Sequence, residues 1–129
     1  MNFKIPIVPV TKKNHQQIIT IKGRPMLIQS KQYRDYEKSA GIYCPKMNIN
    51  FPVNVKAIFN VPTKRRVDLT NLLEALDDVL TRSGTLVDDS AIPAIIVSHD
   101  GSRVVYDKGN GYTEVEISVS EDQEVKNEN

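Results

Sequence analysis

The chain has 129 residues, of which 40% are hydrophobic and 26% are charged, and its formal net charge is +1 at pH 7. These values are those of one soluble globular domain. The sequence contains no run of about 18 or more apolar residues, so no membrane span is predicted. The single cysteine, Cys44, excludes an internal disulfide bond and fits a reducing cytoplasm. An idle or buried thiol is the plain interpretation of Cys44.

The small net charge hides a strong asymmetry along the chain. Residues 1–67 hold 13 Lys and Arg against two acidic residues, a net of +11, whereas residues 68–129 hold four against 14, a net of −10. Such a division predicts a basic surface for phosphates and an acidic surface for cations. The alternative is that folding mixes the two halves in space.

The first half of the chain predicts strands around one helix. Phe3–Val10 is rich in β-branched residues and lacks a small-residue cleavage site, so it is typical of a strand and not of a signal peptide. A polar turn at Thr11–His15 follows. A hairpin with Gly23 at its tip is expected next. The two strands of this hairpin are Gln17–Ile21 and Pro25–Ser30. A helix follows from Ser30 to about Ser39 with Tyr33, Tyr36 and Ala40 on one side, and then a strand at Phe51–Phe59.

The second half predicts a basic loop, a long helix and two closing strands. The loop is Val61–Arg66, and the helix runs from Asp68 to about Thr81 with Ser83-Gly84 ending it. Leucine and valine residues recur along this helix at the spacing of an amphipathic face. The strands are Ile92–Ser98 and Gly111–Ser120, joined through His99–Asn110.

This order of elements predicts an α+β fold. We expect a single domain over residues 1–120, with a mainly antiparallel or mixed sheet and two helices against one face. Residues 121–129 are polar and charged, with four acidic residues and Val125 as their one apolar side chain, and predict a disordered acidic tail.

Acidic side chains gather at both ends of the long helix. Asp68 opens the helix directly after Lys64, Arg65 and Arg66, and Asp88-Asp89 lies in the loop that follows the helix. Magnesium prefers hard oxygen ligands, and phosphodiester hydrolysis needs a metal that activates water, so carboxylates beside a basic loop suit a nuclease. Each piece has a plainer interpretation: a helix cap, a turn and a solvated loop.

The helix also predicts which polar side chains are sheltered. At 100° per residue, Asp68, Asn71 and Asp78 lie on an edge beside the leucine face, whereas Glu74 and Asp77 point further toward solvent. His15 and His99 are too far apart in sequence to indicate a metal pair, and we expect each to be a loop residue. Three tyrosines have two possible interpretations, base stacking or a place in the core or on a dimer surface; they are Tyr33, Tyr36 and Tyr43.

The stretch from Lys64 to Ile92 resembles the RusA-type Holliday-junction resolvases. That family carries a basic loop, Asp-Leu-Asp-Asn-Leu at a helix start, a helix with an internal Asp, and a Gly-x-x-x-Asp-Asp loop before an apolar strand. The matching segments are Lys-Arg-Arg-Val-Asp-Leu-Thr-Asn-Leu at 64–72, Leu-Asp-Asp-Val-Leu at 76–80, and Gly-Thr-Leu-Val-Asp-Asp-Ser-Ala-Ile at 84–92. Outside them the likeness is looser but covers most of the chain except the tail.

The resemblance implies a cytoplasmic homodimer, commonly of phage or prophage origin, that resolves four-way DNA junctions by paired nicks with Mg²⁺. It places the metal on Asp68 and Asp89, with Asp88 adjacent, and lets Asn71 and Asp78 shape the site. It assigns DNA contact to basic and neighbouring polar residues, which are Lys12, Lys13, Asn14, His15, Lys64, Arg65, Arg66 and Asn71.

Two positions depart from the family pattern. Thr70 replaces the second aspartate at the helix start, and Glu74 replaces the catalytic lysine one turn later. Glu74 is a candidate catalytic residue if it supplies the carboxylate that Thr70 lacks. The alternative is a weakened or inactive junction-binding protein on the same fold. A third hypothesis, from another class, is an interaction domain whose acidic half binds a basic partner.

Overall fold

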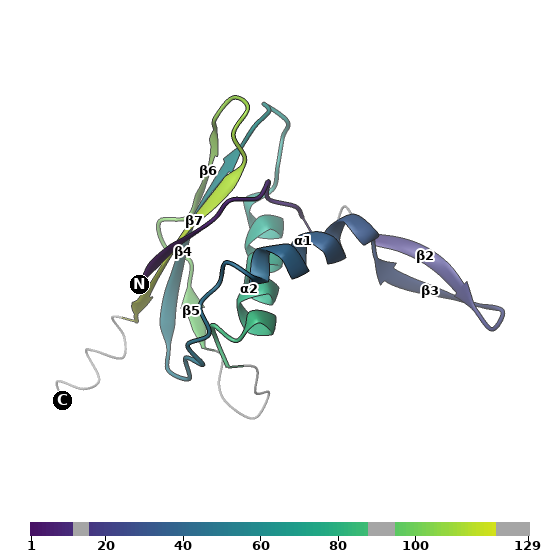
Figure 1. The fold of residues 1–129 in the computed structure, drawn as a ribbon, viewed down its shortest axis with the longest axis horizontal. Coiled ribbons are helices and arrows are strands. Elements are labelled where there is room, and N and C mark those ends of the chain that lie inside the picture. The colour runs from purple at the N-terminus through teal and green to yellow at the C-terminus, as the bar shows by residue number, and fades with distance from the viewer. Residues whose placement is uncertain (12–15, 88–94, 121–129) are drawn as a thin grey trace.

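The computed structural model describes residues 1–11, 16–87 and 95–120 (Figure 1). Along the chain the elements are β1 (Asn2–Ile5), β2 (Gln16–Ile21), β3 (Arg24–Gln29), α1 (Lys31–Gly41), β4 (Val53–Val61), α2 (Leu69–Ser83), β5 (Ile96–Ser98), β6 (Arg103–Tyr106) and β7 (Tyr112–Val119). Neither described helix has the length and apolar character needed to cross a bilayer.

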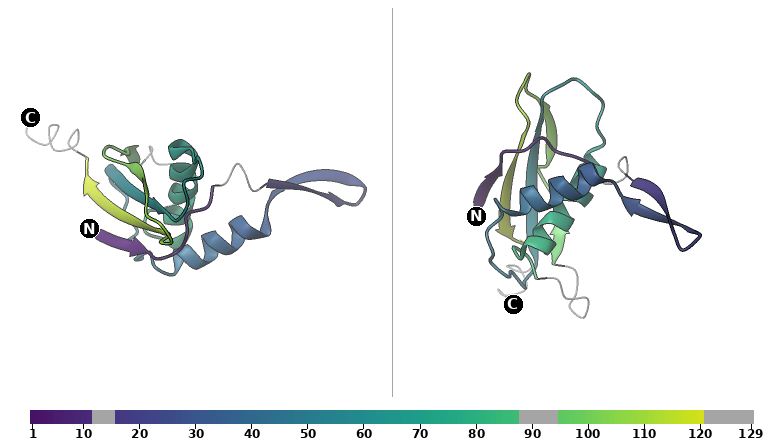
Figure 2. Two further views of the ribbon diagram at one scale, coloured as in Figure 1. Left: turned by 90° about the horizontal axis from the view of Figure 1, so that it is seen from above. Right: turned by 45° about the vertical axis from the view of Figure 1, so that its right-hand side comes forward.

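The main sheet has five strands of mixed direction. Its order is β1-β7-β4-β5, and β6 pairs with β4 as well. The β1–β7 and β7–β4 pairs are antiparallel, whereas β5 and β6 both run parallel to β4. Both helices lie on one side of this sheet (Figures 1 and 2). The predicted α+β class, with a mixed sheet and two helices, is therefore confirmed.

The core lies between β4 and α2. Alternate residues of β4 are buried, from Val53 at 1% exposed to Phe59 at 0%, which is the period of a strand with one face covered. The predicted apolar face of α2 is also buried, as Leu72, Ala75, Leu76, Val79 and Leu80. Helix α1 adds Tyr33 and Tyr36, so base stacking is excluded for these two tyrosines, while Tyr43 is 48% exposed.

Both helices begin where their cap residues predict, and α2 also ends there, whereas α1 continues two residues beyond the predicted Ser39 to Gly41. The Ser30 hydroxyl accepts a hydrogen bond from the Tyr33 N–H at 3.2 Å, and the Asp68 carboxylate caps α2 in the same way. Gly84 ends α2 with φ +88°, a left-handed conformation that glycine adopts without a steric penalty. Cys44 is buried beside α1, and this burial raises the pKa of its thiol.

Two strand predictions were wrong in extent and one strand was missed. Strand β1 ends at Ile5 and does not reach Val10, because Pro6 has no N–H for the ladder and the chain turns at once through an Ile7 N–H to Ile5 carbonyl bond. Strand β4 begins at Val53, after Pro52, and continues to Val61. Strand β6 lies inside the segment predicted as a connection.

Strands β2 and β3 form an arm that projects from the body of the molecule (Figures 1 and 2). They pair with each other from Gln16↔Gln29 to Ile21↔Arg24, close to the predicted hairpin. Lys22 and Gly23 have φ values of +52° and +78°, the left-handed pair that a two-residue hairpin turn needs.

Folding mixes the two charged halves on the sheet. Lys4 of β1 pairs across from Glu114 of β7, and Lys56 of β4 pairs across from Glu116. The expectation of two separate charged surfaces therefore does not hold on this face. The loop before α2 is not separated from acidic residues either, because the Asp107 N–H bonds to the Val61 carbonyl at the start of that loop.

Candidate nuclease site

The basic loop meets α2 at the end of β4. Lys64, Arg65 and Arg66 are all exposed, and the described residues offer them no ion pair. The Lys64 Nζ lies 5.5 Å from the centre of the Tyr106 ring, a cation–π contact that holds one of the three side chains toward β6. Three solvated cations before a helix N-terminus make a surface that favours phosphate.

Asp68 combines a cap with an accessible carboxylate. Its Oδ1 accepts the Thr70 N–H at 2.9 Å, and its side chain is exposed at the N-terminal end of α2. The cap occupies one carboxylate oxygen and leaves Oδ2 of this exposed side chain available to a ligand. The plainer interpretation of Asp68 as a cap is thus confirmed without excluding a ligand role.

Asp68, predicted to be sheltered on the edge beside the leucine face, is instead exposed, because it lies at the helix end where no neighbouring element of the described chain covers it. The other polar residues of α2 follow their expected exposure except for one. Asn71 and Asp78 are half-buried and Glu74 is exposed, as predicted. Asp77, expected to point toward solvent, is instead half-buried at 28% exposure. The described residues contain no group of three acidic, His or Cys side chains that would hold a metal ion.

Several predicted site residues fall outside the described ranges. They are Asp88 and Asp89 of the acidic loop, and Lys12, Lys13, Asn14 and His15 of the first basic turn. The described chain stops at Val87, whose N–H bonds to the Ile49 carbonyl, and resumes at Ile95, whose carbonyl accepts the Val53 N–H. Ile49 lies four residues before β4 and Val53 begins it, and α2 of 15 residues, about 22 Å long, separates both contacts from Asp68.

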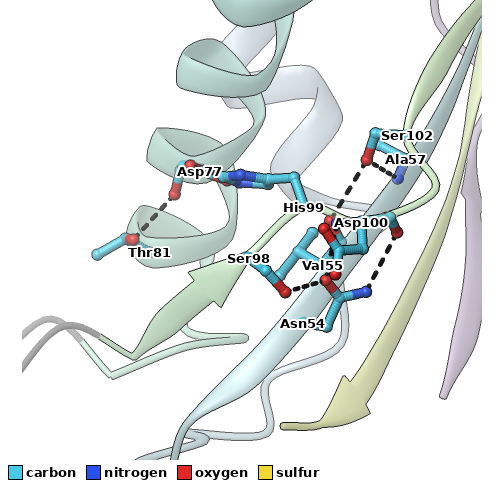
Figure 3. Close-up of polar contacts among 9 residues, drawn as sticks. All are labelled: Asn54, Val55, Ala57, Asp77, Thr81, Ser98, His99, Asp100 and Ser102. Atoms are coloured by element: carbon cyan, nitrogen blue, oxygen red, sulfur yellow. Dashed lines mark hydrogen bonds and ion pairs between the residues drawn. The ribbon is translucent and has the colours of Figure 1, made fainter. Parts of the chain in front are cut away.

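Sequence reasoning missed a contact between Asp77 and His99. The His99 Nε2 lies 3.0 Å from both carboxylate oxygens of Asp77, and each side chain is 28% exposed (Figure 3). Burial raises the pKa of Asp77, and the His99 contact opposes that rise. His99 is a loop residue, as expected, but it ties the end of β5 to α2.

The turn that carries His99 is itself fixed on β4. The Asn54 Oδ1 accepts the Ser98 hydroxyl and the Asp100 N–H, the latter at 2.9 Å (Figure 3). The Ser102 hydroxyl accepts the Ala57 N–H, also at 2.9 Å. These bonds clamp both sides of the turn, so His99 is presented to α2 by a rigid support.

The burial of Asp77 predicts a measurable pH dependence of stability. Because the folded state raises the pKa of Asp77, it binds a proton more readily than the unfolded chain, and the free energy of unfolding falls as pH rises through that raised value. Asp77→Asn removes this contribution, so its stability relative to the wild type should increase from acid to neutral pH. Urea unfolding at several pH values measures it, and parallel profiles for the two proteins would contradict it.

A second polar cluster joins the two helices away from the loop. The Tyr33 hydroxyl donates to Glu37 Oε2 at 3.0 Å, and Glu37 Oε1 lies 3.0 Å from Arg82 Nη1. The Glu37 side chain is only 14% exposed, whereas Arg82 is 72% exposed, so solvent screens this ion pair on the arginine side. The cluster fixes the packing of α1 on α2, and we assign it a structural role.

A basic loop that leads into a carboxylate-capped helix on a small α+β domain is the arrangement expected of a phosphodiester nuclease. A protein-family model described as Endodeoxyribonuclease RusA matches residues 6–119. The chain therefore belongs to the RusA endodeoxyribonuclease family. None of the curated proteins compared with the chain matches it.

Proposed function

We propose that the chain is a magnesium-dependent endonuclease that resolves four-way DNA junctions by paired symmetric nicks, as a homodimer acting in recombination and repair. The observation that carries this proposal is the RusA family match across residues 6–119. The exposed Asp68 carboxylate, beside Arg65 and Arg66 at one helix end, gives the proposal a chemical basis. A cytoplasmic setting fits the single reduced cysteine.

The type of ligand present at Asp68 fits magnesium. Mg²⁺ is usually held by one or two carboxylates with water and substrate phosphate completing its shell. Asp68 supplies one exposed carboxylate, and Asp89, with Asp88 beside it, is proposed as the second source although both lie outside the described residues. Asp89 follows Val87 by two residues, a reach of about 7 Å at most, and Val87 contacts Ile49 at the opposite end of α2. The two carboxylates would therefore meet at one ion only if Asp89 came from the second copy of the dimer. When bound, the metal would activate water and neutralise charge on the scissile phosphate.

The residues of the chain itself have separate tasks in this proposal. Arg65 and Arg66 attract the phosphate backbone, and the N-terminal end of α2 adds its partial positive charge. Asn71, half-buried one turn into α2, is proposed to hold a DNA or water contact. The Asp77–His99 contact holds β5 against α2 and so acts as a positioning pair for the loop that precedes β5.

One observation favours the second candidate, a junction-binding protein with little or no cleavage. Glu74 is exposed and lies six residues after Asp68, a rise of about 9 Å along the helix. A glutamate at that distance, and turned to another side of the helix, is poorly placed to share one metal ion with Asp68. Both candidates share the basic loop, and both predict affinity that falls steeply with salt.

A supercoiled plasmid that extrudes a cruciform tests paired nicking directly. Two symmetric nicks made within one binding event convert the plasmid to a linear product, whereas independent single nicks accumulate open circles first. We expect linear product in Mg²⁺, and none from a matched plasmid that lacks the inverted repeat. Open circles alone would contradict paired nicking, and an uncut plasmid that the protein still binds would favour the second candidate.

A further inference from the structure

The arm made by β2 and β3 exposes apolar side chains on both of its faces. Ile18 and Leu27 pair across the two strands on one face, at 72% and 62% exposed. Ile19 and Met26 pair on the other face, where Met26 is 46% exposed. A contiguous exposed apolar surface of this kind marks an interaction site on a soluble protein.

The arm also lacks a third strand or a helix to support it. Within the described ranges, β2 and β3 form a two-stranded sheet of their own, apart from the five-stranded sheet. Figure 2 shows the arm extending beyond α1 in both views. An isolated two-stranded hairpin is marginally stable in water, and a third strand or a packed surface stabilises it. The arm therefore needs a partner even when no DNA is present.

The distribution of charge on the arm favours a protein partner. Residues 16–21 and 25–29 contain no charged side chain, and the two cations, Lys22 and Arg24, lie at the tip. A polyanion would gain little from uncharged strands. An apolar, β-branched strand edge instead offers N–H and C=O groups for strand addition.

The two edges of the arm differ in what they offer. Strand β3 carries Pro25, which has no N–H to donate, whereas β2 reads Gln-Gln-Ile-Ile-Thr-Ile without proline or charge. Two copies of one strand pair antiparallel about a two-fold axis, which closes the assembly at two copies. In that arrangement the cationic tips lie at opposite ends, about 20 Å apart for six residues, beyond the screening length at physiological salt.

We propose that the arm is the dimerisation element, in which the β2 edge pairs antiparallel with β2 of a second copy and the apolar faces are buried between the two molecules. The inference rests on the homodimer of the function proposed above and is tested without DNA. A dimer that does not use the arm would overturn the inference alone, and a dimer joined by its arms that binds junctions without cutting them would overturn the proposed cleavage alone. A two-fold axis at the arms relates the two α2 helices in the way that symmetric nicking requires.

Sedimentation velocity over a range of dilutions tests the proposal with a matched pair of variants. Ile18→Lys places a charge on the arm, and Ile42→Lys makes the same replacement at a residue 78% exposed at the end of α1. We expect the wild type and Ile42→Lys to form dimers with equal dissociation constants. The dissociation constant of the Ile18→Lys dimer should be higher by about 100-fold or more, since each copy loses a buried isoleucine. A monomeric wild type would overturn the proposal.

A cross-linking experiment covers the case in which the lysine variant disturbs the arm. Ile18→Cys keeps the arm apolar, and a short bis-maleimide should link it to the cysteine of the second copy, whereas Ile42→Cys should give no linked dimer. Cys44 is 6% exposed and serves as an internal background. A dimer that does not cross-link through residue 18 would overturn the placement. If Ile18→Lys stays dimeric and alters junction affinity alone, the arm contacts DNA instead.

Discussion

Asp68→Asn is expected to reduce junction cleavage by at least about 100-fold while leaving the free energy of unfolding almost unchanged. Asparagine caps a helix as well as aspartate does, so the bond to the Thr70 N–H is kept. The negative charge that a metal ligand needs is lost, and metal stabilisation of the transition state is worth several kcal/mol. Initial rates of junction cleavage and urea unfolding measure the two quantities.

Two further variants separate the cap from the ligand. Asp68→Ala removes both functions, so we expect the same loss of cleavage together with a stability lower by about 0.5–2 kcal/mol. Asp100→Asn changes an exposed aspartate whose backbone, not its side chain, bonds to Asn54, and it should cleave like the wild type. Wild-type cleavage by Asp68→Asn would show that Asp68 is a cap and nothing more.

Replacing Arg65 and Arg66 together by glutamine is expected to weaken junction binding and flatten its salt dependence. Each side chain that neutralises a phosphate contributes about 0.9 to the slope of log affinity against log salt, so the double variant should lose nearly two units of slope. At low salt we expect a loss in affinity of about 10- to 100-fold. Fluorescence anisotropy with a labelled junction at several salt concentrations measures both quantities.

The control for this variant is a second pair with the same change in net charge. Lys38 and Lys46 are exposed and lie away from the loop before α2, so Lys38→Gln/Lys46→Gln should keep the wild-type slope. Equal slopes for the two double variants would mean that binding depends on overall charge and not on this loop. The assignment of a DNA surface to Arg65 and Arg66 would then be wrong.

Local chemistry explains why α2 and the arm were predictable from sequence. Asp68 and Gly84 cap the helix, and its leucine spacing indicates which face is buried, so the order of residues alone defines its bounds to within two positions. The hairpin turn at Lys22-Gly23 is also a local feature. These elements need no knowledge of what lies across the fold.

The missed features depend on contacts between distant segments. Strand β6 has four residues and exists because Arg103–Tyr106 meets β4 from Ile58 to Val61 in parallel. Asp77 and His99 are 22 positions apart, and no motif spacing links them. Asp77 was placed toward solvent because helix geometry gives its direction but not the neighbour that covers it. The polar cluster between α1 and α2 was missed for the same reason.

The candidate site was predictable in type more than in geometry. A basic loop, a helix opened by Asp68 and a later acidic pair indicate a nuclease, and the family match supports that class. The position of Asp68 at one end of α2, with Val87 bonded to Ile49 and Ile95 bonded to Val53 at the other end, could not be derived from spacing. It follows from the antiparallel packing of α2 on β4.

Cleavage of an end-labelled synthetic four-way junction, in Mg²⁺ and in chelator, tests the central claim most directly. A linear duplex of the same sequence and the Asp89→Asn variant serve as controls. The proposed function predicts symmetric nicks in opposite strands of the junction, present in Mg²⁺ only, and lost in the variant. Tight binding of the junction by the wild type without any cut in Mg²⁺ would contradict it.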